Sequence, residues 1–532
     1  MKTMFDLGRI REAVKYEGGV SRRLFVAYGG ALAALPTLAR ASQSDANMSF
    51  SSNPFTLGVA SGDPGAQQVV LWTRLAPSPT EPGGGMPNRV VSVNWEIATD
   101  DSMRSVVAKG TEFATPPLAH SVHVEVNGLE PGRWYWYRFH VGDAESPIGR
   151  TRTMPARNAL PGELRFAFTS CQNYEQGLFT AYEHMVEQEL DLVFHLGDYI
   201  YEYEAGRGGK VRTHIGNEIN SLDDYRIRHS QYRTDPLLQA AHARCPWFLT
   251  FDDHEFDNNC AADISEEPHI DPADYLIRRA NAYQAYYEMM PLPRRCLPQG
   301  PDMRLFRRAS FGRLADFMVL DTRQYRTDQP NGDGKKPLNQ SALLRTNTLL
   351  GAKQKNWLSR GLVSSQSLWN VLAQQVMMGM VGFPNQDSPL VYSMDQWPGY
   401  ASERMELMQF MADRRVPNPV VLTGDIHSNW VNELRVDDRR PETNVIATEF
   451  VATSLSSGGN GPENPAGLGE ILAHNPCVKF HNGERGYVSC TVTPEQWRAD
   501  YLVVDDVLKP GGKVFPRASF VVESGNPIVH KA

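Results

Sequence analysis

Short runs of alternating apolar and polar residues dominate the chain from about residue 55 to residue 153. β-Branched and aromatic residues are frequent in these runs, and turn-forming Pro–Gly segments separate them. Evenly spaced short strands of this kind predict a β-sandwich. The strands that we expect lie at 69–73, 90–97, 120–126 and 134–141.

From about residue 163 the pattern changes, and fully apolar runs alternate with helical stretches. Fully apolar runs are typical of strands buried on both faces, and their alternation with helices predicts a layered α/β domain. We expect strands at 164–169, 192–196, 247–251, 317–320, 371–378 and 420–423, and helices at 177–190, 275–290, 351–360 and 401–414.

The segment 129–137 resembles the strand entry of fibronectin type III-like domains. Its aromatic residues alternate, which favours packing in a sandwich core over a carbohydrate-binding platform. We therefore expect a small fibronectin type III-like β-sandwich at 50–155 and an α/β catalytic domain at 161–532.

The first 41 residues have the pattern of an export signal. A twin-arginine sequence at 21–26 precedes a mildly apolar stretch at 24–38, and small residues at 39–41 provide a cleavage point after Ala41. The apolar stretch is too short to span a bilayer comfortably. We expect a twin-arginine signal peptide at 1–41, passage through the twin-arginine export machinery, a periplasmic or secreted location and no stable membrane span.

Charge and cysteine content narrow the functional classes. The 532-residue chain has a formal net charge of −8, and an acidic protein is a poor ligand for duplex nucleic acid. Its six cysteines form no Cys-x-x-Cys pair, which gives a structural zinc site little support. In an oxidising compartment, Cys477 and Cys490 are the nearest candidates for a disulfide.

Four expected strands end in polar clusters that are suited to metal binding. The carboxyl ends of strands in α/β sheets line the ligand crevice, so these clusters should meet. Thiolate and phenolate are strong donors to trivalent iron, whereas carboxylate and amide oxygens suit calcium or magnesium. The clusters lie at 169–172, 197–201, 251–255 with the asparagines at 258 and 259, and 424–427.

Each residue taken singly also has a structural interpretation. Cys171 alone would more often be a buried thiol, Asp198 a turn or cap residue, and His254 a hydrogen-bonded interior histidine. Coincidence is much harder to accept for four strand ends together. Asp198 is the natural carboxylate to bridge two cations, and the loop at 321–323 is a further candidate for substrate contact.

These motifs resemble the alkaline phosphatase D (PhoD-like) family, whose core is related to purple acid phosphatases and other metallophosphoesterases. The Gly-Asp-x-x-Tyr sequence at 197–201 is similar to the purple acid phosphatase motif. The Asp-Asp-His-Glu and Gly-Asp-Ile-His sequences at 252–255 and 424–427 stand where the superfamily has Gly-Asn-His-Glu and Gly-His-x-His. The resemblance implies a metallophosphoesterase-like catalytic domain.

The resemblance also implies a ligand set and a role for each residue. Fe3+ would be held by Cys171, Asp198, Tyr201 and His427, and Ca2+ by Asp198, Asp253 and Asp425 with Asn258 nearby. The catalytic residues would be Asp198 and His254, with His254 assisting the transition state without binding metal.

We therefore expect an enzyme that hydrolyses small phosphate esters by a metal-activated hydroxide or oxide, with phosphomonoesterase and phosphodiesterase activity both open. Two alternatives remain: a phospholipase D-like phosphodiesterase acting on lipids or wall polymers, and a non-catalytic exported binding protein. A serine hydrolase is disfavoured because the expected strands carry no Gly-x-Ser-x-Gly elbow.

Overall fold

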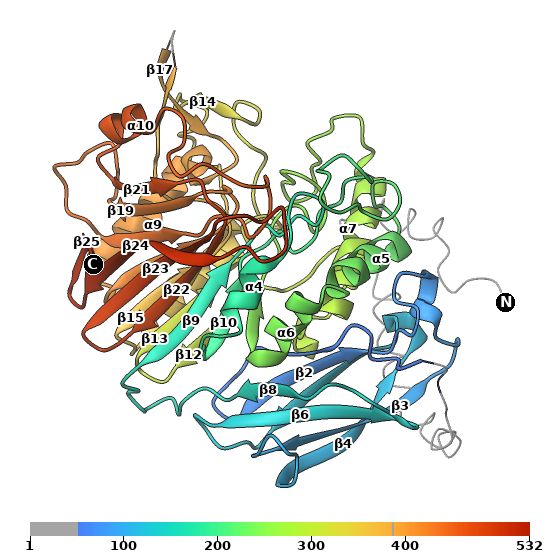
Figure 1. Ribbon diagram of the computed structural model, residues 1–532. Coiled ribbons are helices and arrows are strands. Elements are labelled where there is room, and N and C mark those ends of the chain that lie inside the picture. The colour runs from blue at the N-terminus through green and yellow to red at the C-terminus, as the bar shows by residue number, and fades with distance from the viewer. Residues whose placement is uncertain (1–49, 51, 386–387) are drawn as a thin grey trace.

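The computed structural model describes residues 50, 52–385 and 388–532 (Figure 1). The expected export signal at 1–41 lies outside the described residues. Within the described part of the chain, no helix combines the length and apolar character that crossing a membrane requires. The described chain forms an N-terminal β-sandwich followed by an α/β domain, as the hydrophobic pattern predicts.

The N-terminal sandwich contains all four strands expected from the alternating runs. One of its sheets has the order β4-β3-β6-β7, with β8 paired to β6, and the other contains β1, β2 and β5. The bounds are β1 Val59–Gly62, β2 Gln68–Arg74, β3 Val91–Ala98, β4 Val106–Ala114, β5 Ser121–Asn127, β6 Trp134–Val141, β7 Ala144–Glu145 and β8 Gly149–Arg152.

The second sandwich sheet continues into the first sheet of the α/β domain. Strand β1 pairs in parallel with β11, which gives one ten-stranded sheet of order β25-β24-β23-β22-β9-β10-β11-β1-β2-β5. The two domains therefore share backbone hydrogen bonds. The added strands are β9 Leu164–Thr169, β10 Leu192–His195, β11 Trp247–Leu249, β22 Gly486–Val492, β23 Gln496–Val504, β24 Val514–Glu523 and β25 Asn526–Lys531.

The other large sheet of the α/β domain has seven strands in the order β12-β13-β15-β18-β20-β19-β21, and a small sheet joins β14, β17 and β16. The bounds are β12 Arg307–Phe311, β13 Ala315–Val319, β14 Lys335–Pro337, β15 Trp369–Ala373, β16 Phe383–Asn385, β17 Ser388–Ser393, β18 Pro419–Thr423, β19 Asn429–Leu434, β20 Ala447–Val451 and β21 Val478–Asn482.

The helices cover the outer faces of the two large sheets. Helices α4 to α7 pack on one face of the ten-stranded sheet, and α5, α6 and α7 are drawn in green in Figure 1. The bounds are α4 Thr180–Met185, α5 Leu222–Arg233, α6 Pro236–Arg244, α7 Pro272–Met289, α8 Gly351–Ser364, α9 Ala401–Asp413 and α10 Leu468–His474.

Three buried clusters explain this layered arrangement. Phe166 and Phe194 of the ten-stranded sheet pack on Phe317 of the seven-stranded sheet, so the two sheets stack face to face. The outer face of the ten-stranded sheet packs against α4 to α7. The outer face of the seven-stranded sheet packs against α8 and α9, through residues such as Leu358 and Met408.

The structure corrects several details of the sequence analysis. The helix expected at 177–190 is regular only over α4, and the strand expected at 371–378 ends at Ala373. The pairing of Cys477 with Cys490 is wrong, because all six cysteines are free and buried. The sequence pattern also failed to predict α5 and α6. Neither helix has a well-defined hydrophobic face, and both bury polar residues such as Arg228 and His242.

Candidate metal centre

Sheet topology brings the polar strand ends together. Strands β9, β10 and β11 run parallel and in register, so the residues after each strand emerge at one edge. The backbone N–H of Cys171 donates to the Gly197 carbonyl at 3.0 Å, which ties the first two loops directly to each other. Strand β18 of the facing sheet delivers Asp425 and His427 to the same edge.

The loops turn sharply at the residues that carry the chemistry. Positive φ is found at Cys171 (58°), Asp198 (55°), Asp425 (63°) and His427 (54°). Residues other than glycine adopt this left-handed conformation rarely, and such strain concentrates at functional sites. Each strand end therefore bends to present its side chain to the common edge.

Only glycine fits at position 197, because the backbone there passes close to Asp252. The φ of Gly197 is 110°, and an added Cβ would lie 2.4 Å from the Cβ of Asp252. The absence of a side chain lets the second and third loops approach closely enough for their carboxylates to share a site. A larger residue at 197 would force the loops apart.

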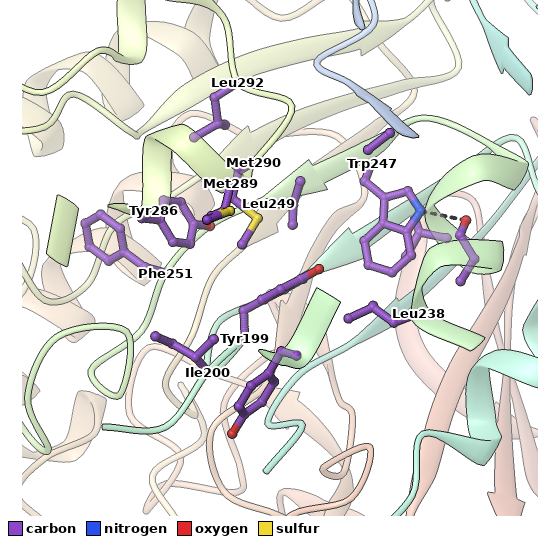
Figure 2. Close-up of a cluster of buried hydrophobic side chains, with 14 of the residues drawn as sticks. Tyr199, Ile200, Leu238, Trp247, Leu249, Phe251, Tyr286, Met289, Met290 and Leu292 are labelled. Atoms are coloured by element: carbon purple, nitrogen blue, oxygen red, sulfur yellow. Dashed lines mark hydrogen bonds between the residues drawn. The ribbon is translucent and has the colours of Figure 1, made fainter. Parts of the chain in front are cut away.

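Hydrophobic packing anchors the loop that carries Asp198. The neighbouring residues Tyr199 and Ile200 are fully buried, and they lie in the same cluster as Trp247, Leu249 and Met289 (Figure 2). The backbone amides of Asp198 and Tyr199 also donate to the carboxylate of Glu255 at 3.0 and 2.6 Å. Asp198 is thus held by the core and by a buried acceptor.

The first candidate ligand group contains a thiol, a carboxylate and an imidazole. Ligand atoms of Cys171, Asp198 and His427 all lie within 4.8 Å of one another. The Tyr201 hydroxyl joins them, 2.8 Å from Asp198 Oδ2 and 3.1 Å from His427 Nε2. The four residues assigned to iron by resemblance therefore meet at one point.

Two further candidate ligand groups lie beside the first. Asp198, Asp253 and His254 form one group, and Asp252, Asp253 and Asp425 form the other, each with its ligand atoms within 4.8 Å. Asp253 belongs to both. A continuous row of acidic groups therefore extends from the thiol to Asp425.

Burial makes this row unfavourable unless a cation is present. Exclusion of water raises the pKa of Cys171 and of Asp198 well above their ordinary values; the negative field of Asp198 adds to the rise at Cys171, and Asp253 adds to the rise at Asp198. The pKa of Tyr201 is raised in the same way, first by burial and then by Asp198. Burial also raises the pKa of Asp425 to about 6.

The orphaned atoms fit a metal centre. Oδ1 of Asp198 and Oδ2 of Asp252 are buried and have no hydrogen-bond partner among the described residues. A buried carboxylate oxygen without a donor is costly, and coordination of a cation would satisfy it. Asp198 therefore has one oxygen on Tyr201 and the other available, as a bridging ligand requires.

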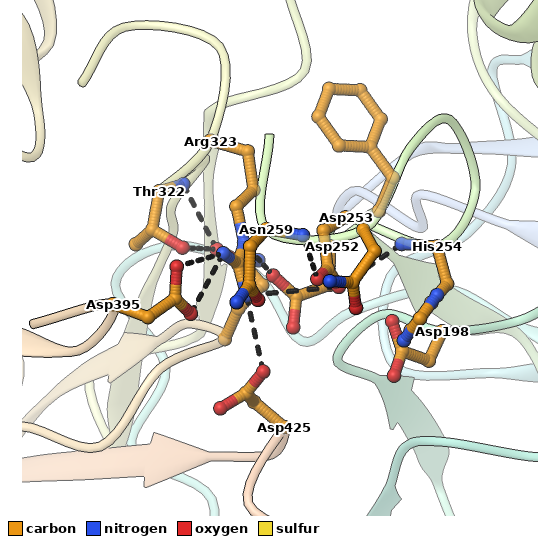
Figure 3. Close-up of polar contacts among 12 residues, drawn as sticks. Asp198, Asp252, Asp253, His254, Asn259, Thr322, Arg323, Asp395 and Asp425 are labelled. Atoms are coloured by element: carbon orange, nitrogen blue, oxygen red, sulfur yellow. Dashed lines mark hydrogen bonds and ion pairs between the residues drawn. The ribbon is translucent and has the colours of Figure 1, made fainter. Parts of the chain in front are cut away.

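Arg323 supplies a buried guanidinium to these acids. Its three nitrogens contact Asp252, Asp395 at 2.9 Å and Asp425 at 3.1 Å (Figure 3). The side chain is only 1% exposed. Burial alone would raise the pKa of Asp253, but the nearby guanidinium lowers it below the ordinary range. Arg323 thus neutralises part of the acidic row and cannot reach bulk solvent.

The loop at 321–323 has a structural role in the described fold. Asp321 accepts from the backbone amides of Arg323 and Gln324 at 3.1 and 2.9 Å, and Thr322 bonds Gln375. All three loop residues are buried, so the loop holds the Arg323 guanidinium rather than lining an open surface.

Two predicted site residues have other polar partners. His254 Nδ1 lies 2.8 Å from Glu202 Oε2, and its ring packs on Tyr201 with centroids 4.2 Å apart. The Asn258 amide donates to Glu266 at 2.8 Å and its oxygen accepts from Tyr203. The adjacent Asn259 instead approaches the acids, with its backbone N–H 2.7 Å from Asp253 Oδ2.

Several residues near the centre escaped the sequence analysis. Ser457 donates to the Tyr201 hydroxyl or accepts from it at 2.8 Å, and Arg485 Nη1 donates to the His427 carbonyl at 2.6 Å. Gln396 donates to Asp425 at 2.9 Å. Serine, arginine and glutamine in loops carry no periodic signal, so the local pattern could not single them out.

Comparisons with known proteins agree with this geometry. A family model described as "PhoD-like phosphatase" matches residues 166–501, and one described as "PhoD-like phosphatase, N-terminal domain" matches residues 39–155. Alkaline phosphatase D of Bacillus subtilis (strain 168) is 50% identical over 525 residues, which cover 97% of this chain and 90% of that protein. A solved "Structure of PhoD" is 51% identical with a TM-score of 0.89, covering 91% of this chain and 93% of that one.

Proposed function

The chain belongs to the PhoD-like phosphatase family, and on that premise we propose how its strand-end residues hydrolyse phosphoric esters. The enzyme class, phosphoric ester hydrolase of the alkaline phosphatase D type, follows from the family. We propose in addition which metals are bound, what each residue does and by which route the protein is exported. The observation that carries it is the meeting of Cys171, Asp198 and His427 within 4.8 Å.

Fe3+ would be held by Cys171, Asp198, Tyr201 and His427. The set combines a soft thiolate and a phenolate with a carboxylate and an imidazole, as a trivalent iron site requires. Burial raises the pKa of both the thiol and the phenol, so neither ionises readily without a cation. Iron binding would therefore release their protons.

Ca2+ would be held by Asp198, Asp253 and Asp425. Their oxygens suit a hard cation, and the family resemblance adds Asn258 as a nearby amide. Arg323 already contacts Asp425 at 3.1 Å, so it offsets part of the charge when this site is filled or empty. Bound cations would supply Lewis-acid stabilisation of the phosphoryl group and lower the pKa of the attacking water.

His254 is the proposed proton donor or electrostatic stabiliser. Burial lowers the pKa of its ring, but Glu202 and the two neighbouring aspartates outweigh burial and raise the pKa well above its ordinary value. These acidic neighbours favour the cationic form of the ring, and Glu202 fixes its orientation through Nδ1. A cation held here can stabilise developing charge or protonate the leaving oxygen.

Small phosphate esters are the substrate class, and both monoesters and diesters remain within the proposal. The structural comparison does not favour a phospholipase D-like enzyme for lipids or wall polymers over this broader activity. We propose periplasmic or secreted location by the twin-arginine route, from the sequence at 21–26. The domain division at 1–41, 50–155 and 161–532 is likewise proposed.

The test compares turnover of chromogenic phosphomonoester and phosphodiester substrates with metal content. Protein purified without chelator should contain iron and calcium and hydrolyse at least one ester, and a calcium chelator should abolish turnover until calcium is restored. Asp198→Asn should lose both metal and activity. Full activity in protein free of iron and calcium would overturn the assignment of the metals. A metal-loaded protein inert towards every ester would favour the binding-protein alternative.

A further inference from the structure

A basic cavity lies along the outer edge of the seven-stranded sheet, away from the metal centre. It has a volume of about 600 Å³ and is bounded by the β1–β2 turn of the sandwich, by β12 and by the end of α8. Its lining includes six arginines and, among the residues that the structure describes, a single acid, Asp63. The arginines are Arg157, Arg295, Arg304, Arg307, Arg308 and Arg313.

This concentration of positive charge contrasts with the chain as a whole, whose formal net charge is −8. Repulsion among six guanidinium groups is unfavourable unless anions neutralise it. Asp63 is shared by Arg307 at 2.8 Å and Arg295 at 3.1 Å, and Asp316 pairs with Arg308. These acids offset only part of the positive charge.

Three of the arginines are available to a ligand. Arg157, Arg304 and Arg313 are exposed, and no acidic partner contacts them within the described residues. Their side chains therefore keep guanidinium donors directed to solvent in and around the cavity. A planar guanidinium binds phosphate oxygens through two parallel hydrogen bonds, which makes arginine well suited to phosphate recognition.

Aromatic rings line another part of the cavity and lower its polarity. Phe306 and Trp357 pack with centroids 5.0 Å apart, and Arg304 lies over the Phe306 ring at 5.5 Å. Rings beside a guanidinium restrict its motion and its hydration, which strengthens its interaction with an anion. One side of this positively charged cavity is therefore aromatic.

The cavity is separate from the proposed reaction centre. None of its lining residues is a candidate metal ligand. Strands β13 and β15 stand between β12 and β18, the strand that delivers Asp425. Three strand spacings of about 4.8 Å give roughly 14 Å between β12 and β18. A ligand in the cavity therefore needs a binding function of its own.

We propose that this cavity binds a chain of two or more linked phosphate groups, held first by the exposed Arg157, Arg304 and Arg313 and then by the other lining arginines. One phosphate cannot contact guanidinium groups contributed by so many segments, whereas linked phosphates can. The site would hold such a chain against the enzyme independently of hydrolysis.

The test is a calorimetric titration of the full, metal-loaded protein with methylenediphosphonate, whose P–C–P linkage the hydrolase cannot cleave. The buffer contains no added calcium, since the probe binds that ion. The variant Arg157→Gln/Arg313→Gln should bind at least tenfold more weakly than the wild type at the cavity. Arg345→Gln is the matched control, because Arg345 is exposed and lies outside the lining. It should bind as the wild type does.

Two further titrations distinguish binding in the cavity from binding at the metal centre, and linked phosphates from a single phosphate. Asp198→Asn should retain the cavity titration, and orthophosphate should bind at least tenfold more weakly than the bisphosphonate. Equal binding by the double variant and the wild type would overturn the proposal, and so would loss of binding only in Asp198→Asn. Equal affinity for orthophosphate would overturn the preference for linked phosphates.

Hydrolysis of a small chromogenic ester should be unchanged in the double variant. This readout shows that the variant is folded, and it distinguishes failure of the cavity proposal from failure of the proposed catalytic mechanism.

Discussion

Nδ1 of His254 lies 2.8 Å from Oε2 of Glu202, and both side chains are buried beside the candidate metal centre. The second oxygen of Glu202 accepts from the Asn258 backbone at 3.1 Å, so the carboxylate is fixed at both ends. This pairing sets the orientation of the imidazole ring, as carboxylates that support catalytic or ligating histidines do.

Replacing Glu202 with Gln should reduce turnover without removing metal. The amide keeps the size of the side chain but removes the charge that holds the imidazolium, so we expect kcat to fall by about 10- to 100-fold. The alkaline limb of the pH–rate profile should also move to lower pH, because the pKa of His254 falls when its partner becomes neutral. Steady-state kinetics and metal analysis of the same preparation measure both effects.

Glu204→Gln is the control for this substitution, since Glu204 is exposed two residues away. An unchanged rate and pH profile in Glu202→Gln would remove Glu202 from the mechanism. A loss of iron equal to the loss of rate would assign it a role in assembling the site instead.

Tyr201→Phe should abolish a visible absorption band. The proposed iron–phenolate bond would absorb visible light, and the hydroxyl is the atom that contacts Asp198 and His427. We expect the phenolate band to disappear and the iron affinity to fall. Absorption spectroscopy and metal analysis measure these two effects. Tyr203→Phe is the chemically matched control, because the Tyr203 hydroxyl donates to Asn258 at 3.4 Å and contacts none of the proposed iron ligands.

The Tyr203 variant should keep the band of the wild type. If Tyr201→Phe retains an identical spectrum and iron content, the phenolate is not a ligand.

Arg323→Met should destabilise the fold. The substitution leaves Asp252 and Asp425 without a cation, while Asp395 keeps Arg326, and removing one partner of a buried pair costs about 3–5 kcal/mol. Urea unfolding of the protein at fixed calcium should show a loss of this size. Added calcium should recover part of it, because a bound cation neutralises the same carboxylates.

Arg345→Met provides the control, since it removes an exposed arginine that contacts none of these acids. A loss below about 1 kcal/mol in Arg323→Met, within the range of surface charges, would show that its contacts with Asp252, Asp395 and Asp425 contribute little.

Stability should decrease in mild acid through His123. This ring joins β5 to the end of α7, with Nε2 3.0 Å from the carbonyls of Tyr287 and Met290. Burial lowers its pKa to about 4, against about 6.5 in an unfolded chain. Between these values the unfolded state binds the proton and the folded state does not, so the free energy of unfolding falls as the pH falls.

The contribution of His123 between pH 7 and pH 5 is about 2 kcal/mol. From pH 7 to pH 5, the free energy of unfolding of His123→Gln should therefore fall by about 2 kcal/mol less than that of the wild type. Urea unfolding of both proteins at both pH values measures this difference. Parallel pH dependence in the two proteins would exclude His123 as the titrating group.

The sequence predicted the frame of the molecule because its signals are local. Alternation in residues 55–153 indicated the sandwich strands, and apolar runs indicated β9, β10 and β18. The strand ends then placed Cys171, Asp198 and Asp425 at a common edge, since parallel strands end together. The helices α5 and α6 were not assigned because they bury polar side chains and lack a regular apolar stripe.

By itself, the sequence determined which residue types stand at the strand ends and therefore which chemistry the edge offers. Only the tertiary structure decided their distances, the pairing of Glu202 with His254, and the insertion of Arg323 among acids from three other segments. The reason is physical: a strand end follows from the local pattern of burial, whereas a buried ion pair depends on packing between segments 50 to 100 residues apart. The six-arginine cavity arises in the same way, because its arginines come from residue 157 and from the segment 295–313, which are far apart in the sequence.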